Sequence, residues 1–453
     1  MMAKIISVLP EIEGLSMIKN PTAKKQLLNS LRSVARLGET AGVVLRAGIR
    51  HATDGAPTPQ LLRETFEQLG ATYIKLGQFI ASSPSLFPRE YVEEFQRCLD
   101  QTPALPYSYI EQTLKEEFGD TPLNSIFQHI EQTPLASASI AQVHAATLVT
   151  GEDVVIKVQK PGVQTILHTD LNVVYGVTKL FEKVVPKLKF ASLSEIVDEI
   201  RSRMVKEVDF VAEAQNIEDF QQFLDATQNT QAIAPKVYHQ ASTRRVLTMQ
   251  RLYGLPLTDL EVVKQYAKDP AQVLISAMNT WFASLMMCKS FHADLHAGNL
   301  LLLKDGRIGF IDFGIVGQLK PEVWGATIGF MDALQHTNYQ EMAKHMVNMG
   351  MTHTKVDVDR LAQDMEKLFS GVLMADPQKV MSGDVADLNA IMLDMVGVGE
   401  RHGIHFPRDF ALLMKQMLYF DRFMRVLTPY MDVFSDSRLQ LLQEAEPGSK
   451  LIH

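Results

Sequence analysis

Alternating apolar and polar positions predict a small antiparallel sheet in the first half of the chain. From Val154 to Gln159, Val154, Ile156 and Val158 share one face, and Val155, Lys157 and Gln159 share the other. The apolar stretch that ends near Ala146 predicts the preceding strand, and the turn Thr150-Gly-Glu-Asp153 joins the two. Two further strands are predicted over 235–239 and 245–252, ending at Tyr253-Gly254.

Helical spacing of apolar residues dominates elsewhere. One continuous helix is predicted from Thr58, with Pro59 in its first turn, to a stop at Ser83-Pro84. Its apolar positions recur every three or four residues, at Leu62, Phe66, Leu69, Tyr73, Leu76 and Ile80. Helices are also predicted over 1–56, over 89–130 with a break at 103–106, from the capping box at Ser192 through 213, and nearly throughout from Asp269 onward. The apolar helix that follows 405–409 is predicted to be core, or a docking face for the N-terminal helices.

One exception to the helical second half is a hairpin. Leu300–Leu303 and Ile308–Ile311 are short apolar strands, and the Asp305-Gly306 pair between them is typical of a tight turn. A hairpin of this length brings Asp312 back beside Asn299, and Asp294 stands five residues before Asn299. The three side chains are therefore expected to converge.

The convergent residues form the pattern H-x-D-x-x-x-x-N followed by D-F-G, which is typical of phosphoryl-transfer enzymes. In that chemistry an Asp orients the phosphate acceptor, and an Asn and a second Asp hold magnesium on the nucleotide phosphates. The pattern predicts Asp294 as the acceptor-orienting acid and Asn299 and Asp312 as magnesium ligands. ATP and Mg²⁺ are the predicted cofactors.

In kinases a lysine on a short strand ahead of such a motif binds the nucleotide phosphates. Lys157 is therefore predicted to be the phosphate-binding lysine. An acidic partner would keep Lys157 charged. Glu213 is the first choice and Glu207 the alternative; on a continuous helix Asp209 would share a face with Glu213. The predicted hinge at Tyr253-Gly254 places the adenine edge near two residues, Met249 and Leu252.

Composition narrows the class of protein. The 453 residues are 46% hydrophobic and 21% charged, which indicates a folded protein with more than one domain. Two cysteines exclude a disulfide framework and fit a reducing compartment. No uncharged apolar run is long enough to span a bilayer. Nothing in the sequence indicates nucleic-acid binding.

Charge is distributed unevenly along the chain. Residues 1–50 carry eight Lys and Arg against three Glu, a net charge of +5. The whole chain has a net charge of −8, so the remaining residues carry −13. A basic, partly amphipathic start can lie on an anionic membrane surface, or it can dock on the acidic body. These two interpretations stay open. The predicted location is cytoplasmic, and the first interpretation adds peripheral contact at the inner face of the membrane.

Four stretches together resemble the AarF/UbiB family of atypical protein-kinase-like proteins. They are K-L-G-Q at 75–78, L-A-S-A-S-I-A-Q-V-H at 135–144, E-V-D-F-V-A-E-A at 207–214, and H-A-D-L-H-A-G-N with D-F-G from 292 to 314. The resemblance implies an α+β, two-lobed kinase fold with a helical N-terminal extension. It divides the chain into the extension (1–120), an N-lobe with a small antiparallel sheet (121–253) and a helical C-lobe (254–453).

The resemblance also implies roles for residues that are uninformative alone. Lys75 and Gln78 would cover the site, with Glu207 and Asp209 as their acidic counterpart. An alanine-rich loop would replace the usual glycine loop over the phosphates, formed by Ala136, Ser137, Ala138 and Ser139. ATP hydrolysis in support of ubiquinone biosynthesis is the implied activity, with a quinone-precursor lipid or other biosynthetic proteins as partners.

Departures from ordinary kinases agree with this resemblance. Ala293 replaces the arginine of the catalytic loop, and His296 stands where a protein kinase has a lysine that steadies the transferred phosphate. No A-P-E element follows Gly314, so a peptide-substrate platform is not expected. Two alternatives stay open: a nucleotide-gated switch that binds a lipid or partner with little chemistry, and a small-molecule kinase, against which the K-L-G-Q helix argues.

Overall fold

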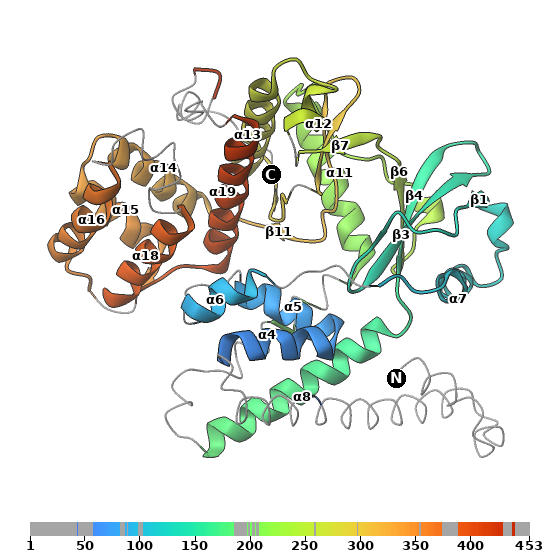
Figure 1. The fold of residues 1–453 in the computed structure, drawn as a ribbon, viewed down its shortest axis with the longest axis horizontal. Helices are drawn as coiled ribbons and strands as arrows, with labels where there is room; N and C mark the ends of the chain where they lie inside the picture. Colours follow the sequence, from blue (N-terminus) through green and yellow to red (C-terminus); the bar gives the residue numbers. More distant parts are fainter. Residues whose placement is uncertain are drawn as a thin grey trace.

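The computed structural model describes residues 58–81, 89–97, 103–184, 208–257, 260–296, 298–352, 355–373 and 388–428, with isolated positions between and beyond these ranges. The predicted N-terminal helices, Glu207 and the capping box at Ser192 lie outside the described residues, apart from Val43 in a helix. Two lobes and a set of N-terminal helices make up the described fold (Figure 1).

The N-lobe is built on a five-stranded antiparallel sheet. Its strands are β1 (Phe127–Ile130), β2 (Ala136–Ser137), β3 (Ala141–Leu148), β4 (Asp153–Gln159) and β6 (Val246–Gln250). The order is β1-β3-β4-β6, and β2 pairs with β3. The predicted core face of β4 is confirmed, because Val154, Ile156 and Val158 are fully buried. Helix α7 (Tyr107–Phe118) packs on this face through Ile110 and Leu114.

Two strand predictions need correction. The segment 89–130 was expected to be helical, but its end is strand β1, in which Phe127 pairs with Leu148 and joins the core. Four residues are too few to show a period of two, so the pattern missed this strand. The strand expected over 235–239 is reduced to one bridge between Val237 and Met249, and the short strand β5 (Ala232–Ile233) precedes it.

The C-lobe is mostly helical, as predicted. Its helices are α12 (Leu260–Lys264), α13 (Pro270–Met287), α14 (Pro321–Gln335), α15 (Tyr339–Met349), α16 (Val358–Leu373), α18 (Leu388–Arg401) and α19 (Arg408–Leu427). The predicted hairpin is present as β9 (Leu300–Leu303) and β10 (Ile308–Phe310), with Gly306 at a φ of 86° in the turn. It joins β5 and β7 (Gly254–Pro256) in the order β5-β10-β9-β7. The remaining strands form two small antiparallel pairs, β8 (Phe291–His292) with β11 (Val316–Gly317) and β12 (Met351–Thr352) with β13 (Ile404–His405).

The N-terminal helices lie below the two lobes. They are α4 (Thr58–Leu69), α5 (Ala71–Ala81) and α6 (Arg89–Phe95), and α5 packs on α8 (Val163–Val184) (Figure 1). The single helix predicted from Thr58 is therefore wrong. Gly70 divides it with a φ of 91°, a left-handed conformation that only glycine adopts at little cost. The break re-aims α5, which carries Lys75 and Gln78.

A second helix also begins later than expected. Helix α11 (Phe210–Ala226) starts after Asp209, whose backbone is extended. The side chain of Asp209 caps the helix by accepting a hydrogen bond from the Val211 amide. Asp209 and Glu213 do not share a helix face, because the chain is not helical at Asp209. Capping competes with continuation wherever an Asp can reach the free amides of the first turn.

Candidate functional site

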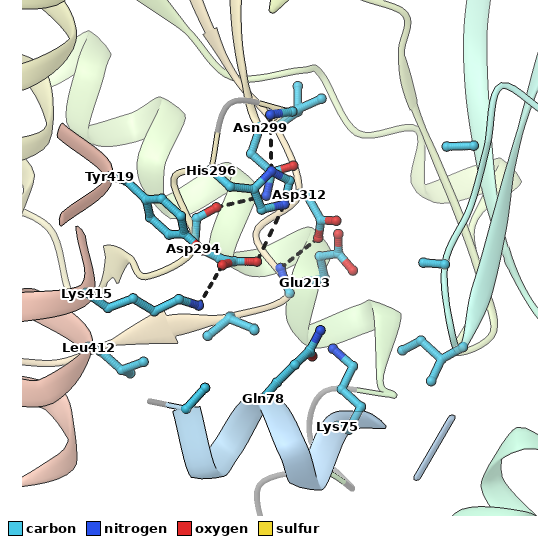
Figure 2. Close-up of a pocket in the computed structure, with 18 of the residues that line it drawn as sticks. Lys75, Gln78, Glu213, Asp294, His296, Asn299, Asp312, Leu412, Lys415 and Tyr419 are labelled. Atoms are coloured by element: carbon cyan, nitrogen blue, oxygen red, sulfur yellow. Dashed lines mark hydrogen bonds and ion pairs between the residues drawn. The ribbon is translucent and has the colours of Figure 1, made fainter. Parts of the chain in front are cut away.

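A cavity of about 1350 Å³ lies between the lobes and above α5. The N-lobe contributes β2, β4 and the segment 249–254, and the C-lobe contributes the loop after β8, the residues after β10 and one side of α19. Figure 2 shows Lys75 and Gln78 rising into this cavity from α5, opposite the acidic side chains of the C-lobe. Cavities for one small ligand usually measure about 300–1,000 Å³, so this one has room for more than one.

Lys157 is the centre of the charged part of the cavity. Alternation along β4 buries its neighbours and turns Lys157 to the cavity side. Its Nζ atom lies 2.7 Å from Oε1 and 3.0 Å from Oε2 of Glu213, and 2.9 Å from Oδ1 of Asp312. The structure thus pairs Lys157 with Glu213, the predicted first choice, whereas Glu207 lies outside the described residues.

The three groups shift one another's pKa values. Burial by itself lowers the pKa of Lys157, but the adjacent Asp312 and Glu213 carboxylates outweigh it and raise that pKa. Burial likewise favours protonated Asp312, but the charge of Lys157 holds the pKa of this carboxyl well below its ordinary value. The pKa of Glu213 is raised, chiefly by burial. Lys157 and Asp312 are thus held in their charged forms.

The loop after β8 positions Asp294 through backbone contacts. The Asn299 side-chain amide donates to the Asp294 carbonyl at 2.9 Å, and the Asp294 amide donates to Nδ1 of His292 at 3.2 Å. His292 is fully buried, and its Nε2 lies 2.9 Å from the Ile311 carbonyl, so the imidazole joins the loop to the strand that leads to Asp312. Burial lowers the pKa of His292, which keeps this connecting ring neutral.

Asp312 is one of three non-glycine residues with a left-handed backbone in the described part of the chain, at a φ of 60°. Asp tolerates this region better than most residues because its short side chain bonds locally. Here the Gly314 amide lies 3.4 Å from Oδ1. The side-chain amide of Asn216 on α11 also donates to the Phe313 carbonyl at 3.1 Å, so the D-F-G segment is tied to the helix that carries Glu213.

Helix α19 contributes polar residues that the sequence analysis did not predict as part of the site. Gln416 is fully buried, accepts from the Leu295 amide at 2.7 Å and donates to the Ala293 carbonyl at 2.7 Å. Lys415 Nζ lies 2.9 Å from Oδ1 of Asp294 (Figure 2). The only signal in the sequence is a polar pair inside an apolar helix, which gives no information about its partner.

Gln416 bonds the backbone on both sides of Asp294, so its loss is expected to destabilise the fold. Replacing Gln416 with leucine leaves a buried amide and a buried carbonyl without partners, each of which costs about 1–3 kcal/mol. We expect the free energy of unfolding to fall by at least about 2 kcal/mol, measured by urea titration. Gln112→Leu is the matched control, because its amide bonds an exposed Glu116 one turn away. Equal stability of both variants would contradict this role.

The remaining predicted site residues divide into two groups. The cavity is lined by Lys75, Gln78, Ala136, Ser137, Ala138, Met249 and Leu252. Ser139 is buried beside this group without lining the cavity, and Asp209 caps α11 and pairs with Arg244 at 3.3 Å, also outside the lining. The continuous helix on which Asp209 would share a face with Glu213 is not present, because α11 begins one residue after Asp209.

A protein-family model for the ABC1 atypical kinase-like domain matches residues 97–346, more than half of the chain. The chain belongs to the ABC1 atypical kinase-like family. This confirms the AarF/UbiB resemblance and the two-lobed, kinase-like α+β fold with a helical extension. The ABC1 domain model spans β4, the loop with Asp294 and the D-F-G segment, all of which line the cavity.

Relatives of this ABC1 family protein occur in plants and bacteria. An Arabidopsis thaliana protein called an uncharacterized aarF domain-containing protein kinase, chloroplastic, is 48% identical over 406 residues, 85% of this chain and 75% of the relative. An uncharacterized Mycobacterium tuberculosis protein is 33% identical over 383 residues, 83% of this chain and 76% of its own. A solved Mycobacterium tuberculosis protein in complex with erythromycin is 23% identical, with a TM-score of 0.48, over 87% of this chain and 97% of its own.

Proposed function

We propose that the protein binds ATP with Mg²⁺ and transfers the γ-phosphoryl group to water or to an apolar acceptor. The observation that carries this proposal is the convergence of Lys157, Glu213 and Asp312 on one wall of the cavity, with Asp294 and Asn299 on the adjoining loop. This set supplies a phosphate-binding cation, two metal ligands and an acceptor-orienting acid. The kinase-like domain of the family supports nucleotide binding.

The donor set fits Mg²⁺. Asp312 is held as a carboxylate, and the Asn299 amide nitrogen is committed to the Asp294 carbonyl, which leaves its oxygen to serve as a ligand. Among the described residues, no group of three His, Cys, Asp or Glu side chains is placed to hold a metal ion. Mg²⁺ usually takes only one or two protein ligands beside the nucleotide phosphates, so two suffice. When bound, the ion neutralises charge on the transferred phosphoryl group.

Residues of the chain would hold the nucleotide from two sides. Lys157 would bind the phosphates. The Ser137 hydroxyl on β2 is buried without a hydrogen-bond partner among the described residues, and it would donate to a phosphate oxygen. Met249 and Leu252 line the cavity where the two lobes join, and would enclose the adenine. An orphaned hydroxyl at a cavity wall supports a polar ligand, because a buried hydroxyl without a partner is costly.

The second part of the cavity supports a role with a quinone-precursor lipid. Its wall near α5, α6, α18 and α19 is apolar and is formed by Phe79, Val92, Phe95, Met392, Val396, Phe406, Phe410, Leu412 and Met414. The polar phosphates of a nucleotide gain nothing by contact with this wall, whereas an apolar acceptor beside Asp294 would bury its surface against it. The finer proposal is therefore ATP-dependent support of ubiquinone biosynthesis, with peripheral contact at a membrane.

None of the helices that the structure describes has both the length and the hydropathy to cross a bilayer.

The runner-up is a nucleotide-gated switch. Helix α5 presents Lys75 and Gln78 to the cavity, and the charge of Lys75 acts on both Glu213 and Asp312. Nucleotide binding would change those charges and so shift α5 and the apolar wall behind it. The same helix covers the side where an acceptor would enter, which argues against an open small-molecule kinase.

The test combines calorimetry with a turnover assay. Titration with Mg-ATP is expected to give binding that EDTA abolishes, and release of inorganic phosphate is expected with wild type but not with Asp294→Asn. Anionic liposomes containing a quinone-precursor lipid should raise the rate over neutral liposomes without it. Binding without turnover would favour the switch, and the absence of any Mg-ATP binding would contradict both functions.

A further inference from the structure

Helix α19 delivers a cation to the acceptor side of the cavity. Lys415 lies more than one hundred residues from Asp294 in sequence, yet its Nζ is 2.9 Å from Oδ1 of Asp294 and its side chain lines the cavity. Asp294 and Lys415 are only 22% and 29% exposed, so water screens this pair less than an ion pair on the open surface. The next residue, Gln416, fixes the register between α19 and the loop.

The loop itself lacks a permanent positive charge at this place. His296, two residues after Asp294, stands where a protein kinase has a lysine, and its Nε2 is 3.8 Å from the second carboxylate oxygen of Asp294. A lysine at this position would carry an ammonium, which stays charged at neutral pH. Lys157 is already bonded to Glu213 and Asp312. Within the described residues, Lys415 brings an ammonium into direct contact with Asp294.

We propose that Lys415 takes the part of the missing loop lysine: it orients the Asp294 carboxylate and lends positive charge to the transferred phosphoryl group. The inference rests on the proposed function. In hydrolysis, a water oxygen forms a bond to the γ-phosphorus while the bond from that phosphorus to the β–γ bridging oxygen breaks. Asp294 receives the proton of the water, and ADP and inorganic phosphate leave. Lys415 holds Asp294 in place for that transfer.

The surroundings of Lys415 suit a fixed charge. Tyr419, one turn further along α19, places its ring centroid 5.5 Å from Nζ, and Figure 2 shows both side chains on the side of Asp294. Burial of the ammonium lowers the pKa of Lys415, but Asp294 and Tyr419 more than offset it and raise that pKa, so the charge is retained. An exposed lysine without such contacts would keep its charge but not its position.

The test separates a role in turnover from a role in nucleotide binding. Lys415→Met is expected to lower kcat for ATP hydrolysis by about 100-fold, in the range for loss of one group that stabilises developing charge, while the Kd for Mg-ATP changes less than about twofold. Lys415→Arg keeps the charge and is expected to recover most of kcat. Lys344→Met removes an exposed lysine that bonds Glu341 on α15, and serves as the control.

A second measurement needs no turnover. Acylation of Lys415 by an amine-reactive ester, followed by mass spectrometry, is expected to be several-fold faster in Asp294→Asn than in wild type, because the ammonium loses its partner. Equal rates would overturn the inference, as would an unchanged kcat in Lys415→Met with an active wild type. A wild type that turns over no ATP at all would instead overturn the proposed function, and this inference with it.

Discussion

Replacing Asp312 with asparagine is expected to abolish ATP turnover while the fold is kept. Asparagine has the same shape as aspartate but no charge. Of the two proposed metal ligands, Asn299 and Asp312, only Asp312 is anionic, so the metal loses that charge. Lys157 also loses one of its two carboxylate partners. Removing one group that stabilises transition-state charge costs about 100- to 1,000-fold in kcat. Phosphate release at saturating Mg-ATP measures the effect.

The hairpin that positions Asp312 offers a matched control. Asp305 lies in its exposed turn and pairs with Arg307 at 2.7 Å, so Asp305→Asn removes the same charge from the same hairpin without touching the cavity. Its kcat is expected to stay within about twofold of wild type, because exposed ion pairs contribute little. An Asp312→Asn protein that hydrolyses ATP as fast as Asp305→Asn would remove the metal assignment.

Replacing Lys157 with methionine is expected to weaken both Mg-ATP binding and stability. Glu213 is 3% exposed, and the substitution leaves its carboxylate beside Asp312 without the ammonium that bonds both acids. Breaking a buried ion pair by removing one partner typically costs about 3–5 kcal/mol of unfolding free energy. Urea titration measures this cost, and calorimetry measures the loss of Mg-ATP binding.

The double variant Lys157→Met, Glu213→Gln separates the two effects. Removing the orphaned charge together with the lysine is expected to restore most of the stability, because the buried carboxylate was the costly part. It should not restore Mg-ATP binding, since the phosphate-binding cation is still absent. Lys264→Met, which breaks an exposed pair with Glu261, is the control for loss of a surface lysine. Recovery of nucleotide binding in the double variant would contradict the role of Lys157.

Local patterns predicted the elements that carry the chemistry. The alternation around Lys157 placed it opposite a buried face, and the Asp305-Gly306 turn brought Asp312 back toward Asn299, because strand and tight-turn geometry depend on a few adjacent residues. The roles of these residues stay predictions until the variants are measured. The wrong helix boundaries also had local causes. Gly70 ends one helix and Asp209 precedes the start of another, although the apolar period continues through both positions.

Other parts of the site were decided by tertiary structure alone. Nothing near Lys415 or Gln416 in the sequence indicates that one would reach Asp294 and the other the backbone on either side of it. The apolar wall of the cavity likewise draws on four helices from two regions of the chain. The sequence by itself determined the family, the strand with its lysine, and the hairpin with its acids, because each depends on contiguous residues. Which distant helix closes the site depends on how the lobes and α19 pack, and that packing is set by many weak contacts that no short pattern encodes.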